Sequence, residues 1–342
     1  MAKIIKFEKE KKNFGDYVNE LTTLCERDLA SINTIIIDKI DSNVPLVKEI
    51  ASYLINSGGK RLRPLFTSCS YQMCNNNNNQ DQLHIGLAAA VEFIHAATLM
   101  HDDVVDESKK RRGYLTANEV WGNKTSVLVG DFLFSRAFQL MAKDGSPEIL
   151  KLLSDTSVTT AEGEVLELTN DKDPTINEDI YFEVIQSKTA SLFSAACQVG
   201  AIAAKTTHEK IEALKTFGTN FGMSFQLIDD AIDYSSSFYH LGKNVGDDFK
   251  EGKVTLPVIL AYLRSSIEEK KFWKRTLQDH NQLKNDFEKA LKIINNYNCI
   301  QDTIKRANHF ANIAKDSLGI FNNTEFKSRL LNLTDSSLTR YH

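Results

Sequence analysis

Apolar residues recur at helical intervals along most of this chain. Between residues 15 and 56, apolar side chains three and four positions apart predict two amphipathic helices with a break near residues 41–45. The glycine pair at 58–59 ends the second of them. Residues 82–106 are apolar on nearly all sides, which predicts a central helix surrounded by other helices.

The same periodicity continues to the end of the chain. Sixteen glycines and five prolines punctuate it, and no series of short alternating runs predicts strands. Residues 235–254 form a long segment rich in Gly, Ser, Asp and Lys, and such segments are usually functional. With no repeat and no linker, we predict one all-α domain over residues 1–342. Its further helices are expected at 61–74, 124–143, 147–168, 176–204, 207–236, 254–265, 267–278, 283–319 and 325–338.

Composition narrows the class of protein. The 342 residues are 42% hydrophobic, and 41 basic against 45 acidic residues give a formal charge of −4, so no overall field recruits nucleic acid. Five scattered cysteines without a CxxC pair disfavour a disulfide framework or a structural zinc site and fit a reducing compartment. Residues 1–12 lack the apolar run of a secretory signal, and residues 85–100 are too short to span a bilayer. We therefore expect a cytoplasmic protein with no transmembrane segment.

Two acidic motifs carry the first chemical signal. On a helix, Asp102 stacks over Asp106, and Asp229 over Asp233, because the members of each pair are four residues apart. Mg²⁺ commonly takes one or two carboxylates together with phosphate oxygens of a substrate. The alternative is a solvated charged helix face, which the apolar flanks of both motifs disfavour. The motifs therefore predict metal ions held against a diphosphate.

Two basic clusters point to phosphate as well. Residues 58–64, GGKRLRP, place Lys60 and Arg63 behind two glycines, and residues 109–113, KKRRG, follow the first acidic motif directly. Glycines let backbone amides approach an anion, and Arg offers forked donors to phosphate. We expect Lys60 and Arg63 to share a helix face. The alternative for GGKRLRP is a helix C-cap followed by surface charges.

His95 precedes Asp102 by seven residues, two helical turns, so both side chains should point to the same side. A histidine in a buried helix is more often a hydrogen-bonded core residue, and this alternative stays open. Glu92 and His95 also form a Glu-x-x-His unit, which di-iron helical bundles use in two copies. No second copy is present.

With these motifs in order, the sequence resembles the trans-type (E-type) polyprenyl diphosphate synthases, most closely the long-chain bacterial group of octaprenyl diphosphate synthases. The matching blocks occur in the family's order over about 200 residues. They are GGKRLRP at 58–64, LMHDDVVDESKKRRG at 99–113, GDFLFSRAF at 130–138, AEGEVLEL at 161–168, KTASLF at 188–193, FQLIDDAIDY at 225–234 and LGKNVGDDFKEGKVTLP at 241–257.

The resemblance implies an isoprenoid synthase fold, an all-α helical bundle around a deep cavity, usually in a homodimer. It implies Mg²⁺-dependent head-to-tail condensation of isopentenyl diphosphate onto an allylic diphosphate, with two or three ions per site. The expected metal ligands are Asp102, Asp106, Asp229 and Asp233. Isopentenyl diphosphate would be held by Lys60, Arg63, His95 and Arg112, and the allylic diphosphate by Arg111, Lys188 and Lys243, with Thr189 and Gln226 lining its side. Catalysis would rest on Asp102, Asp106, Lys188, Asp229 and Lys243.

Three alternatives remain open at this point. A class I terpene cyclase ionises the same substrates but generally lacks GGKRLRP and has an Asn/Ser/Glu metal motif. A non-catalytic subunit of a heteromeric synthase need not keep both acidic motifs and both basic clusters, all of which are whole here. A shorter-chain synthase differs only in product. The one departure from the family pattern is Glu167, where many relatives have Gln.

Product length depends on the residues below the metal site. Ala97 and Thr98 should lie roughly 6 to 8 Å below Asp102, where short-chain relatives place an aromatic floor. Both are small, so we expect the tail to continue to Met141, which lies about 15 Å from Asp131 along the helix predicted at 124–143. The predicted product is about C40, within C35 to C50, made from farnesyl diphosphate for quinone side chains. Transient membrane contact would accompany its release.

Overall fold

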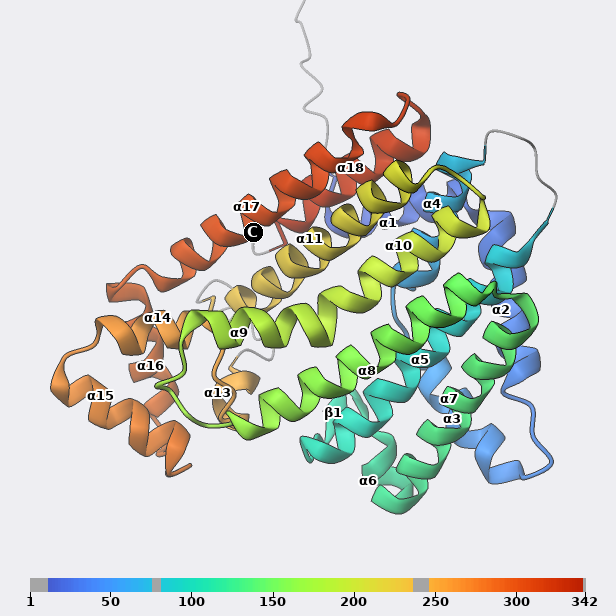
Figure 1. Ribbon diagram of the computed structural model, residues 1–342. Helices are drawn as coiled ribbons and strands as arrows, with labels where there is room; N and C mark the ends of the chain where they lie inside the picture. The colour runs from blue at the N-terminus through green and yellow to red at the C-terminus, as the bar shows by residue number, and fades with distance from the viewer. Residues whose placement is uncertain (1–11, 76–80, 236–245, 341–342) are drawn as a thin grey trace, which may run out of the picture.

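The computed structural model describes residues 12–75, 81–235 and 246–340 (Figure 1). Nearly all of these residues are helical, and the only strands among them are β1 (Lys110–Arg111) and β2 (Tyr114–Leu115), which form a short antiparallel pair after α5. The all-α prediction is therefore confirmed.

The N-terminal region contains three helices where the sequence predicted two. They are α1 (Phe14–Leu24), α2 (Glu26–Lys39) and α3 (Pro45–Asn56). The extra break is at Cys25, whose backbone leaves the helical region while its thiol stays buried. The second break lies where it was predicted, because Pro45 is suited to the first turn of a helix.

Long helices form the centre of the molecule. α5, the predicted central helix, is buried on most sides and packs along α7, while α10 packs between α4 and α11 (Figure 1). α5 is also the one helix in the described ranges that is long and apolar enough to cross a membrane, but 72% of its apolar window is buried in the protein. These helices are α4 (Leu62–Cys74), α5 (Leu83–Val105), α6 (Ala117–Trp121), α7 (Asn123–Asp144), α8 (Pro147–Thr169), α9 (Glu178–Ile185), α10 (Ser191–Ala203) and α11 (His208–Asp233).

The helix predicted at 176–204 contains a π-helical turn, Gln186–Ala190, between α9 and α10. π-turns are rare and are frequent at functional sites. This turn carries Lys188 and Thr189, so it rotates two of the predicted site residues relative to the helices on either side.

The C-terminal region covers one end of the bundle and returns along α11. The helix predicted at 283–319 is two helices, because Asn298 adopts a left-handed conformation with φ of 54°. The elements are α13 (Asp247–Glu251), α14 (Leu256–Arg264), α15 (Ile267–Trp273), a π-turn at Lys274–Gln278, α16 (Asp286–Asn296), α17 (Cys299–Ser317), a 3₁₀ turn at Leu318–Ile320 and α18 (Glu325–Ser337).

Candidate active site

A cavity of about 830 Å³ lies between α4, α5, α8, the α9–α10 segment and α11. Both acidic motifs reach it, since Asp102 at the end of α5 and Asp229 at the end of α11 belong to its wall. The basic segment at the start of α4 lines the same space. The structure therefore brings together motifs that are more than 100 residues apart in the sequence.

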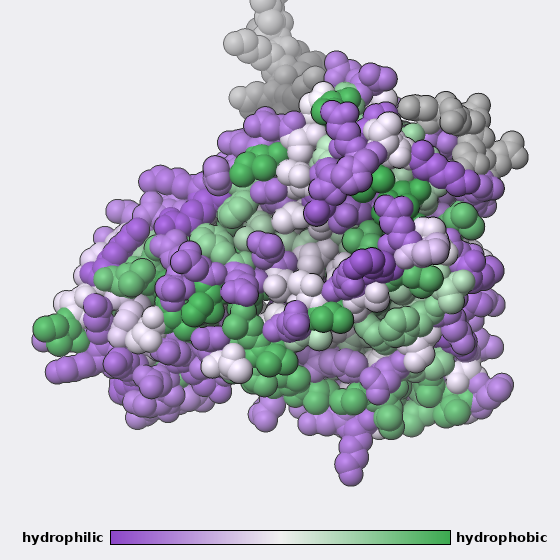
Figure 2. Space-filling model, viewed as in Figure 1, coloured by the Kyte–Doolittle hydropathy of each residue, from purple (hydrophilic) through white to green (hydrophobic). Residues whose placement is uncertain are grey.

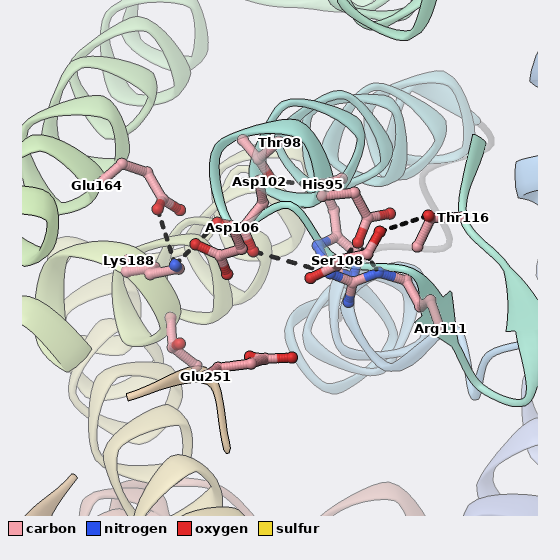
Figure 3. Close-up of polar contacts among 12 residues, drawn as sticks. His95, Thr98, Asp102, Asp106, Ser108, Arg111, Thr116, Glu164, Lys188 and Glu251 are labelled. Atoms are coloured by element: carbon pink, nitrogen blue, oxygen red, sulfur yellow. Dashed lines mark hydrogen bonds and ion pairs between the residues drawn. The ribbon is translucent and has the colours of Figure 1, made fainter. Parts of the chain in front are cut away.

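The first acidic motif is held by cationic side chains (Figure 3). Lys188 Nζ lies 2.9 Å from Asp102 Oδ1, and Lys253 Nζ lies 2.8 Å from Asp106 Oδ2. The buried Asp103, which lies between them in sequence, accepts a hydrogen bond from Arg111 Nε at 2.9 Å, and its Oδ1 lies 2.8 Å from Arg111 Nη2. Asp102 lines the cavity, whereas Asp106 is not in its wall and Asp103 binds Arg111.

Lys188 also contacts two carboxylates on α8. Its Nζ lies 2.7 Å from Glu164 Oε2 and 2.6 Å from Glu167 Oε2. Burial alone would lower the pKa of the ammonium, but the surrounding carboxylates raise it, so Lys188 is protonated. Burial and the charge of Asp102 raise the pKa of Glu164 to about 8.

In the second acidic motif, Asp233 is held by backbone groups. Asp233 accepts hydrogen bonds from the amides of Gly246, Asp247 and Asp248 at 3.1, 3.3 and 3.1 Å, and so occupies the start of α13. Burial raises the pKa of the Asp233 carboxyl, and these three amides oppose the shift.

Asp229 instead pairs with the C-terminal part of the chain. Arg340 Nη2 lies 2.8 Å from Asp229 Oδ1, and its guanidinium stacks 4.0 Å from the ring centroid of Phe225. Burial raises the pKa of Asp229, and the positive charge of Arg340 opposes that rise.

Asp230, the middle residue of this motif, lines the cavity and is bound by two uncharged side chains. Gln226 Nε2 donates to Asp230 Oδ1 at 2.8 Å, and the Tyr181 hydroxyl donates to Oδ2. Thr189 in turn donates to Gln226 Oε1 at 3.0 Å. Burial raises the pKa of Asp230 to about 7. Thr189 and Gln226 on one side of Asp230, and Tyr181 on the other, thus form one hydrogen-bonded chain along the cavity wall.

The predicted isopentenyl diphosphate residues Lys60, Arg63, His95 and Arg112 all line the cavity. Arg63 stacks over the Phe193 ring at 4.4 Å, and its buried Nε has no hydrogen-bond partner within the described part of the chain. Burial lowers the pKa of Arg63 to about 10. Burial and the nearby Arg63 and Arg112 hold the pKa of His95 well below its usual range, so this ring is neutral at pH 7.

One detail of the basic segment was predicted wrongly. Lys60 and Arg63 both line the cavity but do not share a helix face, because α4 begins only at Leu62 and Lys60 lies over the Phe14 ring at 4.9 Å. The glycines make room for Arg112: a Cβ on Gly59 would lie 2.6 Å from Arg112 Nη1, and Arg112 donates to the Gly58 carbonyl.

Comparisons with known proteins agree with this geometry. The family model described as polyprenyl synthetase matches residues 44–294. The chain is 40% identical to the octaprenyl diphosphate synthase of Escherichia coli (strain K12) over 323 residues, covering 94% of this chain and 98% of that protein. A crystal structure of polyprenyl synthase from Caulobacter crescentus CB15, complexed with calcium and isoprenyl diphosphate, is 44% identical with a TM-score of 0.89 and covers 95% of this chain and 98% of that chain. A decaprenyl diphosphate synthase structure from Rhodobacter capsulatus is 40% identical with a TM-score of 0.90 and covers 95% and 99%.

The chain belongs to the polyprenyl synthetase family. The resemblance read from its motifs is therefore confirmed, and its helical fold is that of solved polyprenyl synthases.

The acidic pairs suit the divalent metal ions that a polyprenyl synthase is expected to bind. Among the described residues no three Asp, Glu, His or Cys side chains converge closely enough to hold an ion by themselves. Asp102 with Asp106, and Asp229 with Asp233, instead offer pairs of hard oxygen ligands, which suits an ion that completes its coordination with phosphate oxygens and water.

The predicted chain-length residues lie in two different environments. Thr98 lines the cavity, but Ala97 and Met141 are not in its wall and are almost completely buried in the apolar core shared by α5 and α7. A long product would reach Met141 only if core side chains there move apart. The role of Ala97 and Met141 in product length stays a prediction, and Lys243 lies outside the described residues.

Several residues of the site were not predicted from the sequence, or were given too little weight. Arg340 and Tyr181 carry no local motif, and only the fold brings them to the second acidic motif. Glu164 lies inside a block that matches the family, so its position could have been carried over. Lys253 was noted only as one lysine among several near the long segment, yet it binds Asp106 directly.

Proposed function

We propose that this protein is a long-chain trans-polyprenyl diphosphate synthase that adds isopentenyl diphosphate units to an allylic diphosphate with Mg²⁺. One observation carries the proposal. A single cavity brings Asp102 and Asp229, one carboxylate from each acidic pair, together with two separate sets of cationic side chains, which is enough positive charge for two diphosphates.

The cavity residues divide between the two substrates. Arg111 and Lys188, both bound to the first acidic motif, lie where an allylic diphosphate would be held against Asp102 and Asp106. Arg63, Arg112 and the neutral His95 lie together and would hold isopentenyl diphosphate. Lys60 and Lys243 complete these two sets in the proposal.

The chemistry follows from where charge develops. Breaking the allylic carbon–oxygen bond leaves a diphosphate and a carbocation, and fixed cations aimed at the leaving oxygen stabilise that separation. Bound Mg²⁺, two or three ions in our proposal, would add positive charge at the same place. Attack by the isopentenyl double bond and loss of a proton complete the cycle, and no side-chain nucleophile is required.

The purified chain, supplied with Mg²⁺, isopentenyl diphosphate and farnesyl diphosphate, should give a ladder of products ending near C40. Geranyl and geranylgeranyl diphosphate as primers would define primer preference. An end at C15 or C20 would support a shorter-chain synthase, and no elongation by the chain alone would support a non-catalytic subunit.

Variants at the chain-length positions test the route of the product. Thr98→Tyr places an aromatic ring in the cavity wall and should shorten the product to about C15 or C20 while the first condensations continue. Ala97→Tyr should do the same but must enter a closed core, so its thermal stability must be measured alongside. Met141→Ala should lengthen the product. Unchanged product length in Thr98→Tyr and in a folded Ala97→Tyr would refute the proposed route.

We propose further that the protein forms a homodimer in the cytoplasm. α6 and α7 expose large apolar side chains, including Val120, Leu128 and Phe138, with Leu128 68% exposed. Apolar residues also gather along the lower edge of the face in Figure 2. Sedimentation analysis should give a dimer that Leu128→Glu dissociates, and a monomeric wild-type protein would refute it. Contact with a membrane would accompany release of the apolar product.

A further inference from the structure

Lys188 is shared by carboxylates from two helices, and they use its whole bonding capacity. An ammonium has three donors. Here they face Asp102 on α5 at 2.9 Å and Glu164 and Glu167 on α8 at 2.7 and 2.6 Å (Figure 3 shows the first two). A diphosphate that binds Lys188 must therefore displace at least one carboxylate.

The fold keeps α8 close to this lysine. A Cβ added to Gly163 would lie 2.7 Å from Ser187 Cβ and 3.0 Å from the Lys188 backbone nitrogen, so the two backbones touch where only a glycine fits. The π-turn places Lys188 on this contact. Glu164 and Glu167 follow within about one turn of α8, so the helix keeps both carboxylates near Lys188.

The two α8 carboxylates differ in what else they affect. Glu164 interacts with both Lys188 and Asp102, so a substitution there changes the neighbourhood of a proposed metal ligand. Glu167 makes the shortest contact with Lys188, and its side chain is 36% exposed, so water solvates its charge when Lys188 leaves. Glu167 is therefore the partner that Lys188 can exchange for a diphosphate.

We propose that Glu167 is a positioning residue that acts through Lys188: it holds the ammonium against α8, weakens binding of the allylic diphosphate and so speeds release of the diphosphate-bearing product. This inference rests on the proposed function. Gln at this position would keep a hydrogen-bond acceptor but remove the charge that competes with the diphosphate.

The test compares Glu167→Gln with Glu162→Gln, an exposed residue of the same helix. Inorganic pyrophosphate with Mg²⁺, titrated by calorimetry, should bind Glu167→Gln roughly two- to fivefold more tightly, the scale of one partly exposed ion pair. KM for the allylic substrate should fall, KM for isopentenyl diphosphate should stay unchanged, and kcat should fall as product release slows. Glu162→Gln should match the wild type, and Glu167→Asp should restore most of its behaviour.

A double-mutant cycle shows whether the effect passes through Lys188. In a Lys188→Gln background, Glu167→Gln should leave pyrophosphate affinity unchanged. An equal gain in both backgrounds would overturn the inference, as would weaker pyrophosphate binding or a higher Mg²⁺ requirement in Glu167→Gln. A wild-type protein that binds pyrophosphate as expected but makes no elongated product would instead refute the proposed function.

Discussion

The two acidic motifs have the same spacing but are held by different groups. The carboxylates of the first, Asp102 and Asp106, bind the ends of two long side chains, Lys188 and Lys253. In the second, Asp233 binds three consecutive backbone amides at the start of α13. Lysine side chains can turn from a carboxylate to a phosphate by changing rotamers, whereas backbone amides move only with their segment.

Because of this difference, ligand binding at each motif would require a different part of the protein to move. Substrate binding at the first motif requires an exchange of ion-pair partners within an existing cavity. If Asp233 binds a metal ion through oxygen lone pairs that now accept hydrogen bonds from these amides, α13 must shift. The second motif is therefore coupled to residues 246–254. Asp229 belongs to the second motif but, like the carboxylates of the first, is bound by a side chain, that of Arg340, which lies beyond the last helix.

The largest expected effect is the loss of either motif. Asp102→Ala and Asp229→Ala should each reduce kcat by about a thousandfold or more, because each removes a ligand that acts on transition-state charge. Steady-state kinetics across a Mg²⁺ titration measures this, with Asp155→Ala on the exposed face of α8 as the control. Near-normal kcat with unchanged Mg²⁺ dependence in either variant would refute that motif's assignment.

Substitutions of the two glycines that flank α13 test whether the second motif depends on the backbone amides of this helix. Gly246 and Gly252 both have φ near 84°, so alanine at either should cost about 1 to 2 kcal/mol of stability. Only at Gly246 would the new Cβ collide with the Phe287 ring, at 2.3 Å, and displace the amides that bind Asp233. At Gly252 the nearest atom is the flexible Lys172 Cγ at 3.2 Å.

Gly246→Ala should therefore lower kcat at least tenfold at a temperature where both variants are folded, and Gly252→Ala should lower it much less. Urea unfolding measures the loss of stability in each variant and identifies the temperature at which both are folded. Equal kinetic defects in both variants would mean that α13 acts only through stability and not through Asp233.

Sequence reasoning located what is encoded within one helix. The four-residue spacing of Asp102 and Asp106 places both at the end of α5, and the apolar flanks identify that helix as central. It failed where a single residue changes the backbone: Cys25 and Asn298 interrupt helices whose apolar periodicity continues across them. A left-handed Asn or a one-residue break leaves no trace in an apolar pattern.

Contacts between distant segments were equally hidden. The family blocks predicted that Lys188 belongs to the site, but not that it would meet Glu164 and Glu167, because that depends on how closely α8 approaches the π-turn. Arg340 lies 111 positions after Asp229 and has no motif around it. Such residues are found only when the packing of helices is known.

The smallest predicted effect concerns the indirect support of the second motif. The Tyr181 hydroxyl and Gln226 bind the two oxygens of buried Asp230, next to Asp229 in sequence. Tyr181→Phe removes one of these donors from a buried carboxyl, a loss of roughly 1 to 3 kcal/mol in stability. Because Asp230 is not an exchangeable ligand, kcat should fall only about three- to tenfold, and the Mg²⁺ concentration for half-maximal rate should rise modestly.

Tyr53→Phe, which removes a hydroxyl that donates to the Leu115 carbonyl, is the matched control and should leave both kinetic quantities unchanged. If Tyr181→Phe lowers the melting temperature without changing the Mg²⁺ dependence, the hydrogen-bonded chain from Thr189 through Gln226 to Tyr181 supports the fold but does not position the second motif.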